Sequence, residues 1–240
     1  EAAFTLESYQ KLLDPNYLSV FGRSLWLAVL TTLLTLLIGY PFAYFTAGLP
    51  PKKRSLALML VIVPFWTNSL VRIYGWMILL RGQGVVNSLL AALGLIDAPL
   101  KLLYNFGAVL VGMVYALIPF MILSVYNAVA KLDPALIEAA RDLGAGNFTI
   151  LVKIIFPLTL SGIISGVIMV FVPALTSFVI SDLLGGGKVL LIGNVIEQEF
   201  MQGTNWHLGS GLSVVLMLFV IASMALMNVF DKDGGGTAVW

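Results

Sequence analysis

Long apolar runs separated by short polar segments dominate the pattern of this chain. Most of these runs exceed the roughly 20 residues that a helix needs to cross a bilayer core of about 30 Å. They are continuous, unlike the short alternating segments of a membrane β-barrel. The pattern therefore predicts about five membrane-spanning helices, near residues 25–48, 56–80, 107–129, 158–180 and 209–229.

Composition supports an all-α integral membrane protein. Hydrophobic residues make up 60% of the 240 positions, charged residues only 10%, and the mean hydropathy is +1.00. Soluble domains carry about 25% charged residues. The net charge of +1 leaves no basic stripe for a nucleic acid. The absence of cysteine, together with a single histidine, excludes disulfides and thiolate metal sites. We predict neither a catalytic residue nor a metal site.

Basic residues in short loops predict which side of the membrane each loop faces. The tight loop 49–55 carries Lys52, Lys53 and Arg54 and should be cytoplasmic. Alternation of sides then puts the loop 131–157 in the cytoplasm and the segment 1–24 outside. Because this external start has no signal peptide, we expect a preceding span to be missing from the chain. We expect residues 231–240 to form a flexible tail.

The loop 131–157 contains signals for two short helices. Asp133 can cap a helix and Pro134 suits its first position. Gly144 suits the exit from this helix, and Asn147 can cap a second helix that runs toward Pro157.

In this loop the sequence Glu-Ala-Ala at 138–140 is followed by Gly144 and then by Ile154, Phe156 and Pro157. This spacing resembles the EAA motif of ABC-importer permeases. Phe156 stands where that family usually has leucine. The resemblance implies that the loop forms a coupling helix that docks on a cytoplasmic ATPase. The alternative is an ordinary connector helix with incidental alanines. The residues that match and would serve this coupling are Glu138, Ala139, Ala140, Asp142, Gly144, Ile154 and Pro157.

A second resemblance covers nearly the whole chain. Segments 39–43 (GYPFA), 62–76 (IVPFWTNSLVRIYGW), 181–186 (SDLLGG) and 192–196 (IGNVI) are similar to polyamine-importer permeases of the spermidine/putrescine type, as are parts of residues 4–15. This similarity implies a type I ABC-importer permease fold, which usually has six spans, in the bacterial cytoplasmic (inner) membrane. It also implies the partners: a second permease, two cytoplasmic ATPases that bind ATP and Mg²⁺, and an external substrate-binding protein. This chain itself would bind no cofactor.

Polar and aromatic residues toward the external half are candidates for the path of a cationic substrate. Polar groups inside a span usually face protein or a water-filled cavity, and aromatic rings attract cations. Arg72 should snorkel or pair with a carboxylate, and Asp182 is one candidate partner. Pro64, Pro119 and Pro173 should kink their spans. The path candidates are Asp182, Trp66, Asn68, Ser69, Tyr74 and Asn194.

Other functions remain open at this stage. An ABC permease of this kind could carry another small solute, such as an opine, a phosphonate, iron or thiamine. An ion-coupled secondary transporter would need ionisable groups near the midplane, and Arg72 is the main charge within a span. An intramembrane enzyme lacks an identifiable set of catalytic residues.

Overall fold

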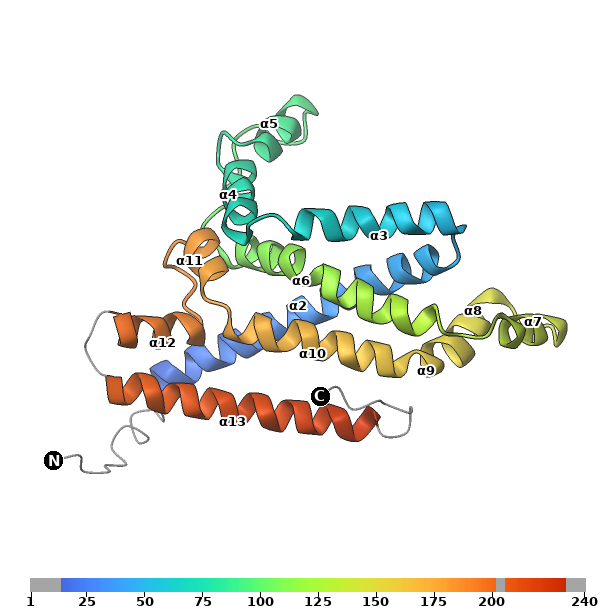
Figure 1. The fold of residues 1–240 in the computed structure, drawn as a ribbon. Helices are drawn as coiled ribbons and strands as arrows, with labels where there is room; N and C mark the ends of the chain where they lie inside the picture. The colour runs from blue at the N-terminus through green and yellow to red at the C-terminus, as the bar shows by residue number, and fades with distance from the viewer. Residues whose placement is uncertain (1–13, 202–205, 232–240) are drawn as a thin grey trace.

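The computed structural model describes residues 14–201 and 206–231, and within these residues it contains helices and no strand (Figure 1). The all-α prediction is confirmed. The first 13 residues of the expected external segment and the tail 232–240 lie outside the described residues. The helices are α2 (Pro15–Ala47), α3 (Pro51–Phe65), α4 (Ser69–Leu80), α5 (Val85–Ala92), α6 (Phe106–Val129), α7 (Pro134–Asp142), α8 (Asn147–Ile150), η1 (Leu151–Ile155), α9 (Phe156–Leu158), α10 (Leu160–Thr176), α11 (Val179–Gly185), α12 (Ile192–Met201) and α13 (Trp206–Asp231).

Helices α2, α6 and α10 pack against one another and form the centre of the molecule (Figure 1). Their shared core includes Ala28 of α2, Met121 of α6 and Val170 of α10. The buried hydroxyl of Thr32 donates to the Ala28 carbonyl at 2.7 Å, which satisfies a polar group that lipid could not.

Three single helices are long and apolar enough to cross a membrane, and two bent helix pairs bring the total to five if each pair is one span. The single helices are α2, α6 and α13. Helix α6 covers nearly the predicted segment 107–129, whereas α2 begins about three turns before residue 25.

The predicted continuous helix 56–80 is wrong. Helix α3 ends at Phe65 and α4 begins at Ser69. The segment Ser69–Ala92, which contains α4 and α5, is bent by 91° from α3. The Asn68 side chain accepts from the Leu70 backbone N–H at 2.8 Å and so caps α4. The polar residues that were predicted to lie inside a span instead start a second helix. Asparagine is favoured at this position because its side chain can accept from a backbone N–H that has no partner within the helix.

The predicted helix 158–180 is also interrupted. Helix α10 ends at Thr176, Ser177 is extended, and α11 starts at Val179. Pro173 lies in the last turn of α10, where its carbonyl accepts from the Ser177 N–H at 2.9 Å. The two breaks, in α3–α4 and in α10–α11, lie where proline is followed within a few residues by small polar side chains.

Candidate functional site

The segment 131–157, predicted to be a cytoplasmic loop, forms a compact group of short helices that projects from one end of the molecule (Figure 1). These helices are α7, α8, η1 and α9. Asp133 caps α7 by accepting from the Ala135 N–H at 2.9 Å, and Pro134 is the first helical residue, as predicted. Gly144 has φ +81°, a backbone conformation that favours glycine. Asn147 begins α8 but does not cap it, because the cap position is Gly146 and has no side chain.

This group, which we call the coupling body (residues 131–158), has a small core of its own. The core consists of Ala140 of α7, Ile150 of α8 and Ile155 of η1, all buried. The segment η1 is π-helical. The segment Asn147–Leu158 is bent by 67° from α10. The separate core lies on the coupling-body side of this bend and holds α7 and α8 together.

The predicted coupling residues divide between this core and the surface. Ala140 is buried and Ile154 is partly buried against the core. The remainder are exposed: Glu138, Ala139, Asp142, Gly144 and Pro157.

Sequence reasoning missed two large apolar residues that are strongly exposed on the same group of helices. Leu143 is 89% exposed and Phe148 is 79% exposed. Both flank the Gly144 turn, so the tip of the coupling body presents a hydrophobic edge. The sequence alone did not single out these two residues, because exposed apolar residues cannot be told from lipid-facing ones in a chain this hydrophobic.

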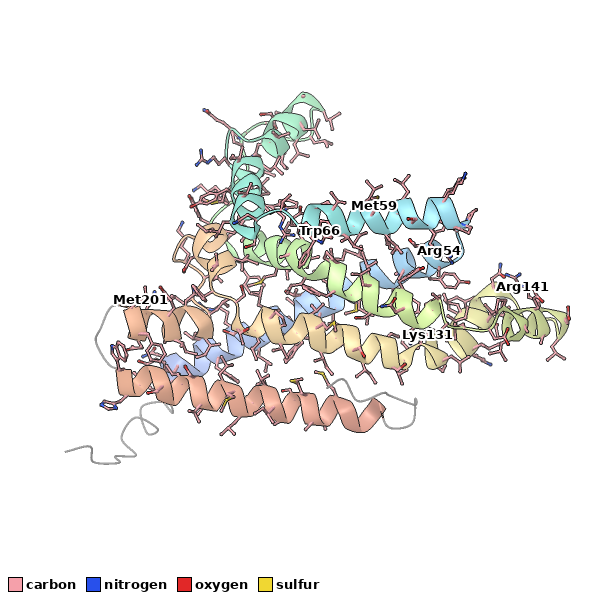
Figure 2. The ribbon with its side chains drawn as sticks, viewed as in Figure 1. Arg54, Met59, Trp66, Lys131, Arg141 and Met201 are labelled. Carbon is pink, nitrogen blue, oxygen red and sulfur yellow. The ribbon has the colours of Figure 1, made fainter. Side chains whose placement is uncertain are left out.

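The coupling body lies at the same end of the molecule as the basic loop after α2. Arg54, Lys131 and Arg141 gather at this end, while Met201 marks the opposite end and Trp66 lies between them (Figure 2). The sequence prediction that loops 49–55 and 131–157 share one side agrees with this arrangement.

The two helix breaks meet around a cavity of about 410 Å³. Ser69 and Arg72 line it from α4, Tyr115 from α6, and Ser177 from the α10–α11 break. Irregular backbone at membrane depth is tolerated where it is buried in protein or lines a water-filled space. The cavity, which we call the break cavity, therefore brings the two helix breaks together behind a mostly apolar lining that carries a few polar side chains.

Of the two expectations for Arg72, pairing with a carboxylate is not seen among the described residues. Its guanidinium carbon lies 5.0 Å from the centre of the Phe65 ring. Its Nε is buried and has no hydrogen-bond partner among the described residues. Asp182, the candidate partner, is instead bound elsewhere.

Asp182 and Asn194, both predicted for the path, are brought into direct contact. Asn194 is 1% exposed and donates to the Asp182 carboxylate and, at 3.2 Å, to the Phe178 carbonyl. Its own amide oxygen accepts from the Leu191 N–H at 3.0 Å. Asn194 thus holds the α11–α12 connection together, while Asp182 stays exposed with one carboxylate oxygen toward Asn194.

The other path candidates lie apart from this pair. Trp66 is 82% exposed at the end of α3, and Tyr74 is exposed on α4. Asn68 is engaged as the α4 cap. Of the six predicted path residues, Ser69 alone is among those that line the break cavity.

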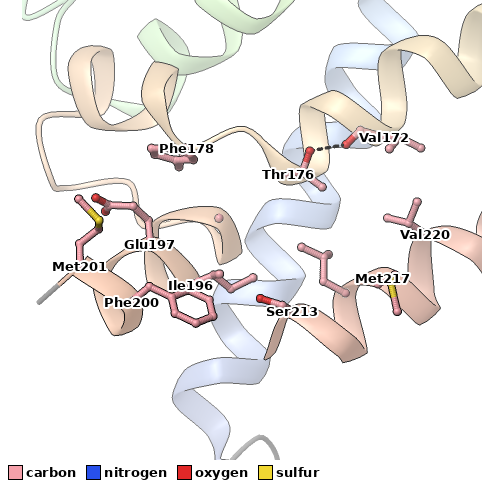
Figure 3. Close-up of a pocket in the computed structure, with 12 residues that line it drawn as sticks. Val172, Thr176, Phe178, Ile196, Glu197, Phe200, Met201, Ser213, Met217 and Val220 are labelled. Atoms are coloured by element: carbon pink, nitrogen blue, oxygen red, sulfur yellow. Dashed lines mark hydrogen bonds between the residues drawn. The ribbon is translucent and has the colours of Figure 1, made fainter. Parts of the chain in front are cut away.

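A second cavity, of about 560 Å³, lies between α10, α12 and α13 (Figure 3). Its walls are mostly apolar, with Glu197 as the charged residue and Phe178 and Phe200 as its aromatic members. Glu197 was not among the predicted path residues. Within the described residues, no group of three His, Asp or Glu side chains could hold a metal ion.

Comparisons with known proteins agree with this architecture. The family described as "Binding-protein-dependent transport system inner membrane component" matches residues 38–233. The spermidine/putrescine transport system permease protein PotB of Escherichia coli K12 is 49% identical over 215 residues, which cover 90% of this chain and 78% of that protein.

Two solved structures share the fold. One is a bacterial ABC transporter involved in the import of the acidic polysaccharide alginate, with a TM-score of 0.79, 17% identity, and coverage of 98% of this chain and 86% of the other. The second is the bacterial alginate ABC transporter in complex with alginate pentasaccharide-bound periplasmic protein. Its TM-score is 0.72 and its identity 18%, and the match covers 97% of this chain and 87% of the other.

Proposed function

This chain belongs to the family of binding-protein-dependent transport system inner membrane components, and we propose that it forms half of the translocation pore for putrescine or spermidine in an ATP-driven ABC importer. It is a multi-pass protein of the bacterial cytoplasmic membrane. The observation that carries the substrate proposal is the 49% identity, over 90% of the chain, to a permease named for spermidine and putrescine.

The coupling body is the proposed contact with the ATPase. Its exposed edge, with Leu143 and Phe148 beside the Gly144 turn, supplies apolar area for a groove in another protein. Glu138 and Asp142 on α7 are exposed and can meet basic or N–H groups there. A projecting body is suited to transmit force when its helices pack on a shared core, as these do around Ala140, Ile150 and Ile155.

The remaining partners follow from the same proposal. A second, homologous permease would complete the pore, and two ATPase subunits would bind ATP and Mg²⁺, so this chain would neither catalyse hydrolysis nor bind a cofactor. An external binding protein would deliver the amine. The transporter with a periplasmic protein bound, which shares this fold, supports a partner of that kind.

The proposed path runs along the external half of the chain. Asp182 offers an exposed carboxylate to an ammonium group, and Trp66 and Tyr74 offer exposed rings. Asn68 and Asn194 hold backbone groups near them, and Ser69 begins α4. Arg72 in the break cavity would repel a cation, so we propose that the amine passes outside this cavity.

Uptake of labelled putrescine and spermidine tests the proposal. The complete transporter, with its ATPase, second permease and binding protein, is expressed in cells that lack polyamine import. We expect saturable uptake that a Glu138→Arg substitution abolishes while membrane insertion persists. Normal ATP hydrolysis without amine uptake in the unsubstituted complex would instead point to another solute, such as an opine, phosphonate, iron or thiamine.

A further inference from the structure

A hydrogen bond joins α2 to the junction between the coupling body and α10. The Tyr40 hydroxyl lies 3.1 Å from Thr159 Oγ1. Thr159 is fully buried and occupies the single position between α9 and α10. The contact therefore connects a transmembrane helix to the base of the projecting body.

The direction of this hydrogen bond can be derived. The Thr159 hydroxyl donates to the Ile155 carbonyl at 2.8 Å, with a longer contact of 3.2 Å to the Phe156 carbonyl. A hydroxyl has one hydrogen to donate. Tyr40 must then be the donor toward Thr159, and removal of its hydroxyl leaves the Thr159–Ile155 bond in place.

Ile155 connects this junction to the interior of the coupling body. Its side chain is buried with Ala140 and Ile150. Its carbonyl also accepts from the Thr159 backbone N–H at 2.9 Å. Ile155 thus links the core of the coupling body to Thr159, and Thr159 in turn contacts Tyr40.

Without the contact to Tyr40, the junction between the coupling body and α10 has features that would let it flex. The π-helical segment η1 precedes it, the helix axis bends by 67° at Thr159, and π-helical turns occur frequently at functional sites. The Tyr40 ring adds a second contact, tilted against the Phe156 ring at 5.7 Å between centroids.

We propose that Tyr40 is a positioning residue that fixes this bend to α2, so that motion of the coupling body moves the pore helices instead of being lost at the junction. The proposal rests on the proposed function, because it assumes that an ATPase moves the coupling body. A neutral hydrogen bond changes an equilibrium constant by a factor of about 2 to 10.

Tyr40→Phe is a clean variant, since it keeps the ring against Phe156 and removes only the hydroxyl. Tyr44→Phe is its matched control: Tyr44 lies one turn further along α2 and is exposed. In proteoliposomes with the complete transporter, we expect Tyr40→Phe to raise the ATP hydrolysed per spermidine imported by about two- to tenfold. The control should match the unsubstituted protein. Tyr40→Phe should still fold, with a thermal midpoint lowered by at most about 6 °C, as expected for the loss of one hydrogen bond.

A double-mutant cycle tests whether the two hydroxyls act through each other. Thr159→Ser keeps the hydroxyl and should behave as the unsubstituted protein does, whereas Thr159→Val should raise the same ratio. Tyr40→Phe should then add nothing in the Thr159→Val background. Additive effects, or a Tyr40→Phe variant indistinguishable from Tyr44→Phe, would overturn the proposal.

Failure of the substrate assignment would look different. If the unsubstituted transporter hydrolyses ATP but imports no polyamine, the substrate is wrong, and the junction is tested by stimulation of ATP hydrolysis by the external binding protein. We expect this stimulation to be weaker by about two- to tenfold in Tyr40→Phe than in Tyr44→Phe. Equal stimulation would contradict the role of Tyr40.

Discussion

At the residue scale, single side chains serve either backbone geometry or the proposed chemistry, and the structure separates the two. Asn68 and Asn194 read as polar path residues in the sequence, yet both use their amides to hold backbone groups. Asp182 is different, since its carboxylate is exposed despite the contact with Asn194. Polarity within an apolar stretch is therefore not by itself a sign of a route for solute, because it also marks helix ends.

Asp182→Asn should weaken amine uptake without disturbing the fold. Asparagine still offers an oxygen to the Asn194 amide, so the variant removes the charge alone. Loss of one exposed charge contact of up to about 1 kcal/mol should raise the KM for spermidine by about two- to fivefold. Concentration-dependent uptake measures this, with the exposed Asp97→Asn as control. Unchanged KM would remove Asp182 from the path.

Gly144→Ala should impair coupling through backbone strain. With φ at +81°, a side chain at this turn costs roughly 1–2 kcal/mol. We expect weaker co-purification of the ATPase, because the hydrophobic edge around Leu143 and Phe148 is displaced. Gly146→Ala is the control, since Gly146 has φ −69° and open space around it. Equal recovery of the ATPase with both variants would show that the turn geometry does not matter for docking.

At the scale of elements, hydrophobic periodicity predicted where helices lie but not where they break. The span α6 was predicted to within one residue, and its apolar run continues without a break past the interior Pro119. In α3–α4 and α10–α11, proline is followed by residues that can satisfy free backbone groups from their own side chains or turns. Whether such a segment kinks or breaks depends on tertiary contacts that a single sequence does not reveal. The short helices α5 and α12 were missed because they are too short to cross a membrane.

Close packing of α6 and α10 depends on glycine. A Cβ at Gly162 would lie 2.3 Å from the Ala128 Cβ and 2.9 Å from the Ser124 carbonyl oxygen. Small residues allow helices in membranes to approach in this way. Gly162→Val should lower stability by about 1–3 kcal/mol through overpacking, seen as a lower thermal midpoint of the detergent-purified protein. Gly22→Val on α2, which meets nothing within 4 Å, is the matched control. Equal midpoints would show that α6 and α10 are not held this closely.

At the scale of the whole molecule, the two ends differ in a way that the sequence anticipated. The coupling body lies at one end with Arg54, Lys131 and Arg141 (Figure 2). Helices α11, which contains Asp182, and α12 lie toward the other end (Figure 1). The positive charges predicted this sidedness because a short basic loop stays in the cytoplasm. The contact of α2 with the α10 junction was not predictable, since Tyr40 and Thr159 look like ordinary span residues until the helices are packed.

This sidedness can be measured directly because the chain contains no cysteine. Leu143→Cys, at the tip of the coupling body, and Met201→Cys, at the end of α12, place single thiols at exposed positions of opposite ends. A membrane-impermeant maleimide applied to intact spheroplasts should label Met201→Cys and leave Leu143→Cys unlabelled. Permeabilised cells should label both, which controls for reactivity. Labelling of Leu143→Cys from outside would invert the topology, and with it the assignment of the coupling body to the ATPase, because ATP is available on the cytoplasmic side.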